Sequence, residues 1–258
     1  MCGICGKINF DKSHPVDAAL LERMADSLHH RGPDDTGITC AGPVGLGHKR
    51  LSIIDLSTAG RQPMSNEDGS LLLVFNGEIY NFEELRRELK SKGHCFTSQT
   101  DSEVILHLYE EEYTDCVKRL RGMFAFALWD QSRRQLMLSR DRAGQKPLVY
   151  AADGKALIFA SEIKALLQDP AVAAEVDPEA IHHYLTYQYI PGPGTIFKGI
   201  KKLPPAHTLI LKNGSLSLEP YWQLSYEPKL VLNSETEYTQ HLLDVFRESV
   251  KIRLRSDV

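Results

Sequence analysis

The sequence predicts an α+β fold in which helices flank antiparallel sheet. From Gly122 onward four apolar runs follow one another, "GMFAFALWD", "RQLMLSRD", "KPLVYAAD" and "KALIFASE", with turn residues between them. Connections this short join antiparallel strands, because parallel strands need a crossover of a dozen or more residues. We therefore expect an antiparallel meander here. Segments of helical periodicity lie on both sides of this strand-rich middle.

The N-terminal part predicts strands and helices in mixture. A strand is expected over residues 3–10 and a helix over residues 17–30, and the runs "VGLGH", "LSIID" and "LLLVF" predict further strands. A helix is expected in "FEELRRELKSKG", with Gly93 as its stop. Thr100 and Glu103 have the spacing of a capping box, which predicts that the next helix begins near Asp101.

The C-terminal part predicts a helix in "DPEAIHHYLTYQYI" and a hairpin in "HTLILKNGSLSL", with Asn213 and Gly214 as its turn. Ser234 is expected to cap a last helix that has an apolar stripe. Little of the chain remains for that stripe to pack against. We therefore expect a first domain over residues 1–225, and in residues 226–258 a linker with the first helix of a second, truncated domain.

The composition is that of a globular protein, with 42% hydrophobic residues and a net charge of −4 from 30 basic and 34 acidic residues. Nucleic acid is not expected as a partner, because no basic run is present that would follow a phosphate backbone. A membrane is not expected either, since the sequence has neither a secretion signal nor an apolar run of about 20 residues. Five scattered cysteines fit a reducing compartment, which predicts a cytoplasmic location.

The opening "MCGICG" has several interpretations. A zinc site would need a second ligand pair, and a redox C-x-x-C should open a helix instead of lying in a strand. Cys5 is interpreted as a small apolar residue of the first strand. Removal of Met1 would leave Cys2 with both a thiol and a free α-amine. An α-amine has a pKa of about 7.7 to 8.0, so it can act as the general base for the thiol.

In order and spacing, a series of motifs resembles the N-terminal glutaminase domain of glutamine-dependent asparagine synthetases, a class II glutamine amidotransferase. The motifs are "MCGICG", "HHRGPDDTG", "HKRLSIID", "FNGEIYNF" and "TDSEVI", and the match continues through "LSRDRAGQKPL" and "PGPGTIFKGIKKLPPAH" to "RLRSDV". The resemblance implies the N-terminal-nucleophile (Ntn) hydrolase fold, in which two antiparallel sheets are stacked between helical layers (αββα). It also implies hydrolysis of L-glutamine to glutamate and ammonia.

The resemblance assigns roles residue by residue. Cys2 corresponds to the nucleophile, while the side-chain amide of Asn76 and the backbone N–H of Gly77 correspond to the oxyanion hole. Other positions correspond to the glutamine pocket: Arg50 for the α-carboxylate, Glu78 and Asp101 for the α-ammonium, and Leu51, Ser52, Ile53 and Ile54 for its lining. No metal ligand is implied.

Several of these residues also have structural interpretations. Asn76 and Gly77 form one of the strongest hairpin-turn signals, and Arg50 fits a surface ion pair. Asp101 fits a helix cap, where the helix N-terminus would stabilise its anion. Arg31 and Asp34 in "RGPDD" are expected to shape the loop near Cys2 without taking part in the chemistry.

In the full-length family, the ammonia passes to a C-terminal synthetase domain that activates aspartate with ATP and Mg²⁺. The nucleotide-binding motif of that domain would follow "RLRSDV" and is not in this sequence, so we expect no cofactor in this chain. The expected partners are therefore L-glutamine and that synthetase domain, and a homodimer is left open. Ala143 and Val149 depart from the family pattern, so coupling between the two activities could differ.

Three other functions stay open. The first is an asparagine-synthetase-like amidotransferase with another acceptor. The second is the glutaminase of an amidotransferase for purine or amino-sugar synthesis, against which "FNGEIYNF" and "PGPGTIFKGIKKLPPAH" argue. The third is a non-catalytic regulatory module of the same fold, against which the presence of Cys2 argues.

Overall fold

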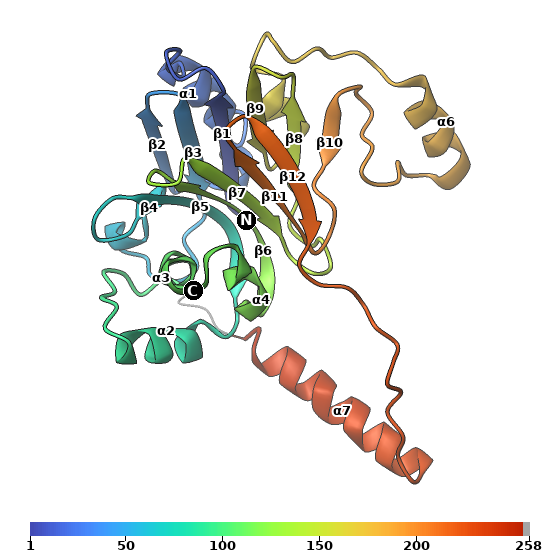
Figure 1. Cartoon of the computed structure of the whole chain (residues 1–258). Helices are drawn as coiled ribbons and strands as arrows, with labels where there is room; N and C mark the ends of the chain where they lie inside the picture. The colour runs from blue at the N-terminus through green and yellow to red at the C-terminus, as the bar shows by residue number, and fades with distance from the viewer. Residues whose placement is uncertain (255–258) are drawn as a thin grey trace.

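The computed structural model describes residues 1–254 and contains two six-stranded antiparallel sheets (Figure 1). The first sheet has the order β10-β8-β9-β1-β3-β2. Its strands are β1 (Gly3–Asn9), β2 (Asp35–Ala41), β3 (Val44–Arg50), β8 (Val149–Ala152), β9 (Ala156–Ala160) and β10 (Ile200–Lys202). The N-terminal strand β1 is therefore central, paired with β3 on one side and with β9 on the other.

The second sheet has the order β12-β11-β7-β6-β5-β4. Its strands are β4 (Met64–Ser65), β5 (Leu71–Ile79), β6 (Gly122–Asp130), β7 (Gln135–Arg140), β11 (His207–Lys212) and β12 (Ser215–Pro220). The expected hairpin is confirmed as β11 and β12. Asn213 and Gly214 both have positive φ, as a type I′ turn requires.

The two sheets pack face to face around a shared core. Side chains alternate along β1, so that Ile4 and Ile8 enter this core while Cys5 packs on the opposite face of the sheet. The second sheet contributes Val74, Ala127 and further apolar residues to the same core. The expected structural role of Cys5 is thus confirmed.

Helices cover the outer face of each sheet. On the first sheet lie α1 (Ala18–Asp26) and the short α5 (Ile163–Leu166), and on the second lie α2 (Phe82–Ser91), α3 (Glu103–Glu112) and α4 (Cys116–Arg119). The expected helix over residues 17–30 is shorter than predicted, because a 3₁₀ turn, His29–Arg31, follows α1. Two further 3₁₀ turns are Thr58–Gly60 and Tyr113–Asp115. The four layers confirm the αββα arrangement.

The four strands after Gly122 are confirmed, but the prediction of one meander is wrong. β6 pairs with β7 and β8 pairs with β9, yet the two pairs belong to different sheets. The chain crosses between the sheets over residues 141–148. The buried carboxylate of Asp141 holds this crossing, since it accepts backbone N–H bonds from Ala143, Gln145 and Lys146 at 3.0–3.1 Å.

Two strand predictions near the site differ from the structure. The run "LSIID" forms no strand, because β3 ends at Arg50 and residues 51–55 turn away as an irregular segment. Conversely, β2 lies where a loop was expected. The pattern does not predict β2 because "DTGITCA" is an edge strand with Ile38 as its one large apolar residue.

Two helices, α6 (Pro178–Tyr187) and α7 (Glu235–Lys251), lie outside the four layers (Figure 1). The expected cap of α7 is confirmed, because Ser234 Oγ accepts the N–H of Glu237 at 3.2 Å. No residue of α7 is buried. The end of the "RLRSDV" match, residues 255–258, lies outside the described residues. No helix within residues 1–254 combines the length and apolar character needed to cross a membrane.

Candidate active site

Cys2 lies directly before β1, beside the end of β3. Its Sγ is 3.4 Å from the backbone N of Leu51 and 3.6 Å from the carbonyl oxygen of the same residue. Arg31 Nε donates to the Cys2 carbonyl at 2.9 Å, and Asp34 Oδ2 accepts the N–H of Ser52 at 2.8 Å. These contacts agree with the expectation that Arg31 and Asp34 shape the loop near Cys2.

One cavity of about 400 Å³ lies at Cys2, between the end of β3, the end of β5 and the segment before α3. Nine of the ten residues that the sequence assigns to the site line it: Cys2, Arg50, Leu51, Ile53, Ile54, Asn76, Gly77, Glu78 and Asp101. Ser52 is the exception. It lies in a neighbouring hollow with Asp34 and Asp35.

Arg50 is the last residue of β3 and is buried at 6% exposure. Its guanidinium donates to the carbonyl oxygen of Ser57 at 2.8 Å and to that of Asp55. These bonds curl the segment after β3 around the arginine, which explains why "LSIID" does not continue the strand. A Cβ at Gly60 would lie 2.1 Å from Arg50 Nη2, so the glycine leaves the space that the guanidinium occupies.

Asn76 and Gly77 lie inside β5, opposite Ala125 and Phe124 of β6, so the hairpin-turn interpretation is wrong. The turn signal fails because pairing with β6 continues through both residues. Asn76 is 1% exposed, and its Nδ2 has no hydrogen-bond partner among residues 1–254. A buried amide donor without a partner costs free energy, about 1–3 kcal/mol, unless a ligand accepts from it.

Two carboxylates face the same cavity. Burial raises the pKa of Glu78, and the nearby Lys146 ammonium partly offsets the rise. Burial also raises the pKa of Asp101 to about 7, although Asp101 Oδ2 accepts the N–H of Ile79 at 2.7 Å. The sequence led us to expect that the helix N-terminus would stabilise the Asp101 anion. In the structure, desolvation of the carboxylate exceeds the stabilising effect of the local backbone donors.

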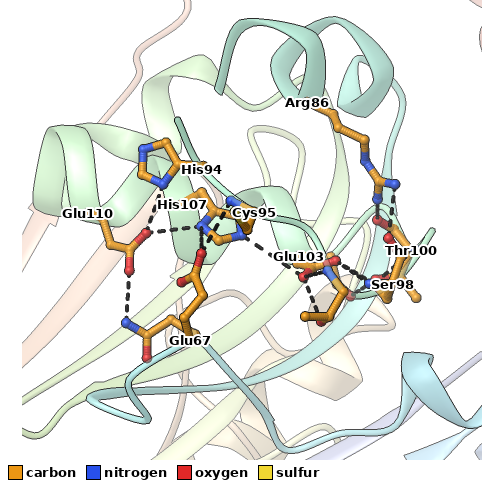
Figure 2. A network of polar contacts seen from close by, with 12 residues as sticks. Glu67, Arg86, His94, Cys95, Ser98, Thr100, Glu103, His107 and Glu110 are labelled. Carbon is orange, nitrogen blue, oxygen red and sulfur yellow. Dashed lines mark hydrogen bonds and ion pairs between the residues drawn. The ribbon is translucent and has the colours of Figure 1, made fainter. Parts of the chain in front are cut away.

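A buried polar network positions the segment that leads to Asp101 (Figure 2). Arg86 of α2 donates to the carbonyl oxygens of Ser98 and Thr100 at 3.0 and 2.6 Å. The Glu103 carboxylate accepts the backbone N–H groups of Thr97 and Ser98 at 2.7 and 2.9 Å. The expected capping box is therefore wrong, since Glu103 reaches residues farther back and α3 begins at Glu103.

Several cavity residues were not predicted from the sequence, among them Gln62, Met123 and Lys146. Lys146 is 6% exposed, and burial lowers the pKa of its ammonium. Its position follows from the Asp141 carboxylate, which holds the crossing segment between the sheets. The signal in the sequence is a lysine between Gly144 and Pro147, six residues after the end of β7, and this signal is weak without the fold.

The nucleophile candidate is a neutral thiol in need of a base. Burial raises the pKa of the Cys2 thiol, and burial lowers the pKa of the amine at Met1. Met1 precedes Cys2 in this chain, so the Cys2 nitrogen is still an amide. Removal of Met1 would convert that nitrogen into an amine next to the thiol.

Comparison with known proteins identifies relatives of the whole chain. A family model described as glutamine amidotransferase domain matches residues 1–222. The chain is 40% identical over 261 residues to asparagine synthetase (glutamine-hydrolyzing) 3 of Bacillus subtilis (strain 168), covering 100% of this chain and 42% of that protein. It is also 40% identical over 254 residues to amidase chyE of Penicillium rubens, covering 97% of this chain and 37% of that protein. The chain thus spans less than half the length of these relatives.

The fold has a solved counterpart. A glutamine phosphoribosylpyrophosphate amidotransferase from B. subtilis, complexed with ADP and GMP, superposes with a TM-score of 0.63 at 20% identity. The superposition covers 86% of this chain and 50% of that chain. At this identity the likeness shows the fold alone, and it confirms the N-terminal-nucleophile hydrolase arrangement. Together with the match over residues 1–222, these findings show that the chain belongs to the glutamine amidotransferase family.

Proposed function

We propose that this glutamine amidotransferase domain hydrolyses L-glutamine with Cys2 as the nucleophile, after Met1 has been removed. The observation that carries the proposal is the Asn76 amide. It is buried, its Nδ2 has no partner within residues 1–254, and it lines the same cavity as Cys2. Such a donor is stabilised when an oxyanion forms beside it.

In the first half of the reaction, the free α-amine of Cys2 takes the thiol proton and Sγ attacks the amide carbon of glutamine. The resulting oxyanion accepts from Asn76 Nδ2–H and the backbone N–H of Gly77. The C–N bond then breaks, the ammonium returns its proton to the leaving nitrogen, and ammonia departs. A thioester remains on Cys2.

In the second half, the same amine takes a proton from water, and the hydroxide formed attacks the thioester carbon. The second oxyanion uses the same two donors. The C–S bond breaks, the thiolate takes the proton back from the ammonium, and glutamate leaves. Each proton removed is returned, so the site is regenerated without a cofactor.

The charges of the cavity suit the backbone groups of free glutamine. We assign the α-carboxylate to Arg50 and the α-ammonium to Glu78 and Asp101, all of which line the cavity. Arg50 also holds the carbonyl oxygens of Asp55 and Ser57, so substrate binding and the conformation of the segment after β3 are linked. Leu51, Ile53 and Ile54 contribute the lining of the same pocket.

In a longer protein, we propose that the ammonia serves ATP- and Mg²⁺-dependent asparagine synthesis from aspartate in a C-terminal synthetase domain. The identity to an asparagine synthetase over the whole chain supports this. We divide the chain into a glutaminase domain, residues 1–225, and a linker with the first synthetase helix, residues 226–258. The exposed apolar side chains of α6 and α7 would then contact the synthetase domain. A homodimer and a cytoplasmic location remain predictions.

A second candidate differs in the acceptor of the ammonia. The observation that favours it is the 40% identity to amidase chyE, since this relative is not named as an asparagine synthetase. An assay of the longer protein with glutamine, ATP and aspartate separates the two. Asparagine formation supports the first candidate, whereas glutamine hydrolysis without asparagine supports the second.

The proposed chemistry is tested by intact mass spectrometry before and after exposure to 6-diazo-5-oxo-L-norleucine, a glutamine mimic that alkylates the nucleophile. We expect loss of Met1 and a single adduct on Cys2. Cys2→Ala should give neither an adduct nor glutamate release. Cys40→Ser, which changes an exposed thiol on β2, should retain both. An adduct that persists in Cys2→Ala would contradict the proposal.

A further inference from the structure

Two histidines and a glutamate meet where the segment after α2 reaches α3 (Figure 2). None of the three lines the cavity at Cys2. His94 lies in the segment after α2, and His107 and Glu110 lie one turn apart on α3. The two imidazole rings have centroids 5.0 Å apart. His107 is 1% exposed, so this cluster is partly in the protein interior.

Both imidazoles direct the same ring atom at one carboxylate oxygen. His94 Nδ1 is 3.2 Å from Glu110 Oε2, and His107 Nδ1 is 3.0 Å from that oxygen. One ligand atom from each residue lies within 4.8 Å of the others. Zinc bonds to nitrogen and oxygen are about 2.0–2.2 Å, so tetrahedral ligand atoms are a little over 3 Å apart. The two nitrogen–oxygen spacings are close to this value, whereas the ligand atoms farthest apart, at up to 4.8 Å, would move closer together around an ion.

The outer ring atoms face further carboxylates. His94 Nε2 is 3.1 Å from Glu111 Oε1, and His107 Nε2 is 4.0 Å from Glu103 Oε1. Metal-bound histidines usually donate their other N–H to a carboxylate, which sets the tautomer. His107 Nε2 has no hydrogen-bond partner within residues 1–254. With a metal on Nδ1, this atom would carry a proton facing Glu103.

The acidic ligand is also oriented by a neighbour. Asn66 Nδ2 donates to Glu110 Oε1 at 2.8 Å, which leaves Glu110 Oε2 directed at the two imidazoles. Glu67 Oε1 lies 4.0 Å from His107 Nδ1 and accepts the backbone N–H of Cys95 at 3.3 Å. Glu67 or a water molecule would complete a tetrahedral set.

We propose that His94, His107 and Glu110 form a binding site for one divalent transition-metal ion of the Zn²⁺ class. Two imidazoles with a carboxylate suit Zn²⁺ or Co²⁺ better than Mg²⁺ or Ca²⁺, which prefer oxygen ligands. The ion would join the segment after α2 to α3, the helix that Asp101 precedes. The role is therefore structural. Sequence patterns did not predict this site, because 12 residues separate His94 from His107 and only folding brings them together.

The test is a Co²⁺ titration of the 258-residue chain carrying Cys2→Ser, which removes a competing thiol at the N-terminus. We expect one equivalent to produce the visible d–d bands of a tetrahedral complex and Zn²⁺ to displace it. His94→Gln and Glu110→Gln should each weaken binding by at least about tenfold, and Glu111→Gln by about tenfold as an outer partner. His29→Gln, an exposed histidine outside the cluster, should leave the affinity unchanged.

Two outcomes would overturn the proposal. One is the absence of stoichiometric Co²⁺ binding, and the other is binding that His94→Gln and Glu110→Gln leave intact. Thiol binding is checked with Cys95→Ser, because Cys95 is exposed and adjacent to His94. Loss of the complex in that variant alone would assign the ion to the thiol and reject the His94, His107 and Glu110 site. The readout does not depend on glutaminase activity.

Discussion

At the scale of single residues, the site depends on polar groups that folding buries without satisfying them. Asn76 Nδ2 has no partner within the described chain, and burial moves the pKa of Asp101 to about 7. Both features cost stability in the free protein. Both are useful if a substrate supplies the missing oxyanion and ammonium, because the interaction then forms in an already desolvated site.

Asn76→Ala should lower kcat for glutamine hydrolysis by about 10²–10³-fold, the usual effect of removing one oxyanion donor. The free energy of unfolding should change little, because the lost amide has an unsatisfied donor. Glutamate release and urea unfolding measure the two effects. Asn81→Ala is the matched control. Asn81 bonds Arg119 O and Arg121 N, so its loss should cost about 1–3 kcal/mol of stability while leaving kcat intact.

Asp101 should make stability depend on pH. Its pKa is about 7 in the folded protein, above the unfolded value of about 3.9, so the folded state binds more protons between these values. The free energy of unfolding should therefore fall as pH rises from about 4 to about 7. Asp101→Asn should remove this part of the slope, measured by urea unfolding at several pH values. Asp244→Asn, an exposed carboxylate of α7, should leave the slope as it is.

The same carboxylate should shape the activity profile. On the proposed assignment, the α-ammonium of glutamine binds an ionised Asp101, so kcat/KM should rise with pH through about 7. In Asp101→Asn the KM should be higher. The increase of kcat/KM with pH should also be lost, apart from the part that titration of the Cys2 amine contributes. An unchanged profile would exclude Asp101 from substrate binding.

At the scale of elements, the helices on the second sheet hold the loop that carries Asp101. Arg86 of α2 spans the gap to the segment before α3 and satisfies two buried carbonyl oxygens there. Helix α2 thus does more than cover the second sheet. Through Arg86, which does not itself line the cavity, α2 positions one wall of that cavity.

Arg86→Ala should lower the free energy of unfolding by about 2–4 kcal/mol, since it leaves the Ser98 and Thr100 carbonyl oxygens without donors. The KM for glutamine should also rise, because the segment before Asp101 is less restrained. Arg87→Ala is the matched control in the same helix. Arg87 is exposed, and within residues 1–254 its side chain donates only to the Glu83 carbonyl oxygen of its own helix, so both quantities should stay near wild type.

At the scale of the whole molecule, α7 is nearly independent of the four layers. It has no buried residue, and its apolar stripe is exposed; the stripe consists of Tyr238, Leu242, Val245 and Phe246. An exposed ion pair between Arg121 and Glu248 at 2.8 Å joins α7 to the sheet region, and Arg253 stacks on Tyr80 just beyond the helix. Exposed ion pairs contribute about 0–1 kcal/mol and such stacking about 0.5–1 kcal/mol.

Removal of residues 226–258 should therefore change the free energy of unfolding of the remaining chain by no more than about 2 kcal/mol. Chemical denaturation of the two chains side by side measures this. The shorter chain should also associate less at high concentration, because the exposed stripe of α7 is gone. A loss well above that figure would show that α7 belongs to the first domain and that the expected boundary at residue 225 is wrong.

Much of the site was predictable because local sequence carries its chemistry. Three features are visible in the sequence without the fold: a thiol directly after Met1, an arginine at the end of an apolar strand, and an Asn-Gly pair. The family resemblance then assigned a role to each of them. Ser52 shows the limit of this reasoning, since its neighbours line the cavity and it does not. Lys146 shows the converse, because a single lysine gives no signal until Asp141 holds its loop.

By itself, the sequence determined the longer helices, most strands, the hairpin turn at Asn213 and Gly214, and most of the residues that line the cavity at Cys2. Periodicity, turn chemistry and motif order are local properties. Tertiary structure decided the rest. It sent β8 and β9 to a different sheet from β6 and β7, paired Asn76 and Gly77 within β5 instead of in a turn, and brought His94 beside His107 and Glu110. Which partner a strand takes, and how far a carboxylate is desolvated, depend on residues distant in the chain.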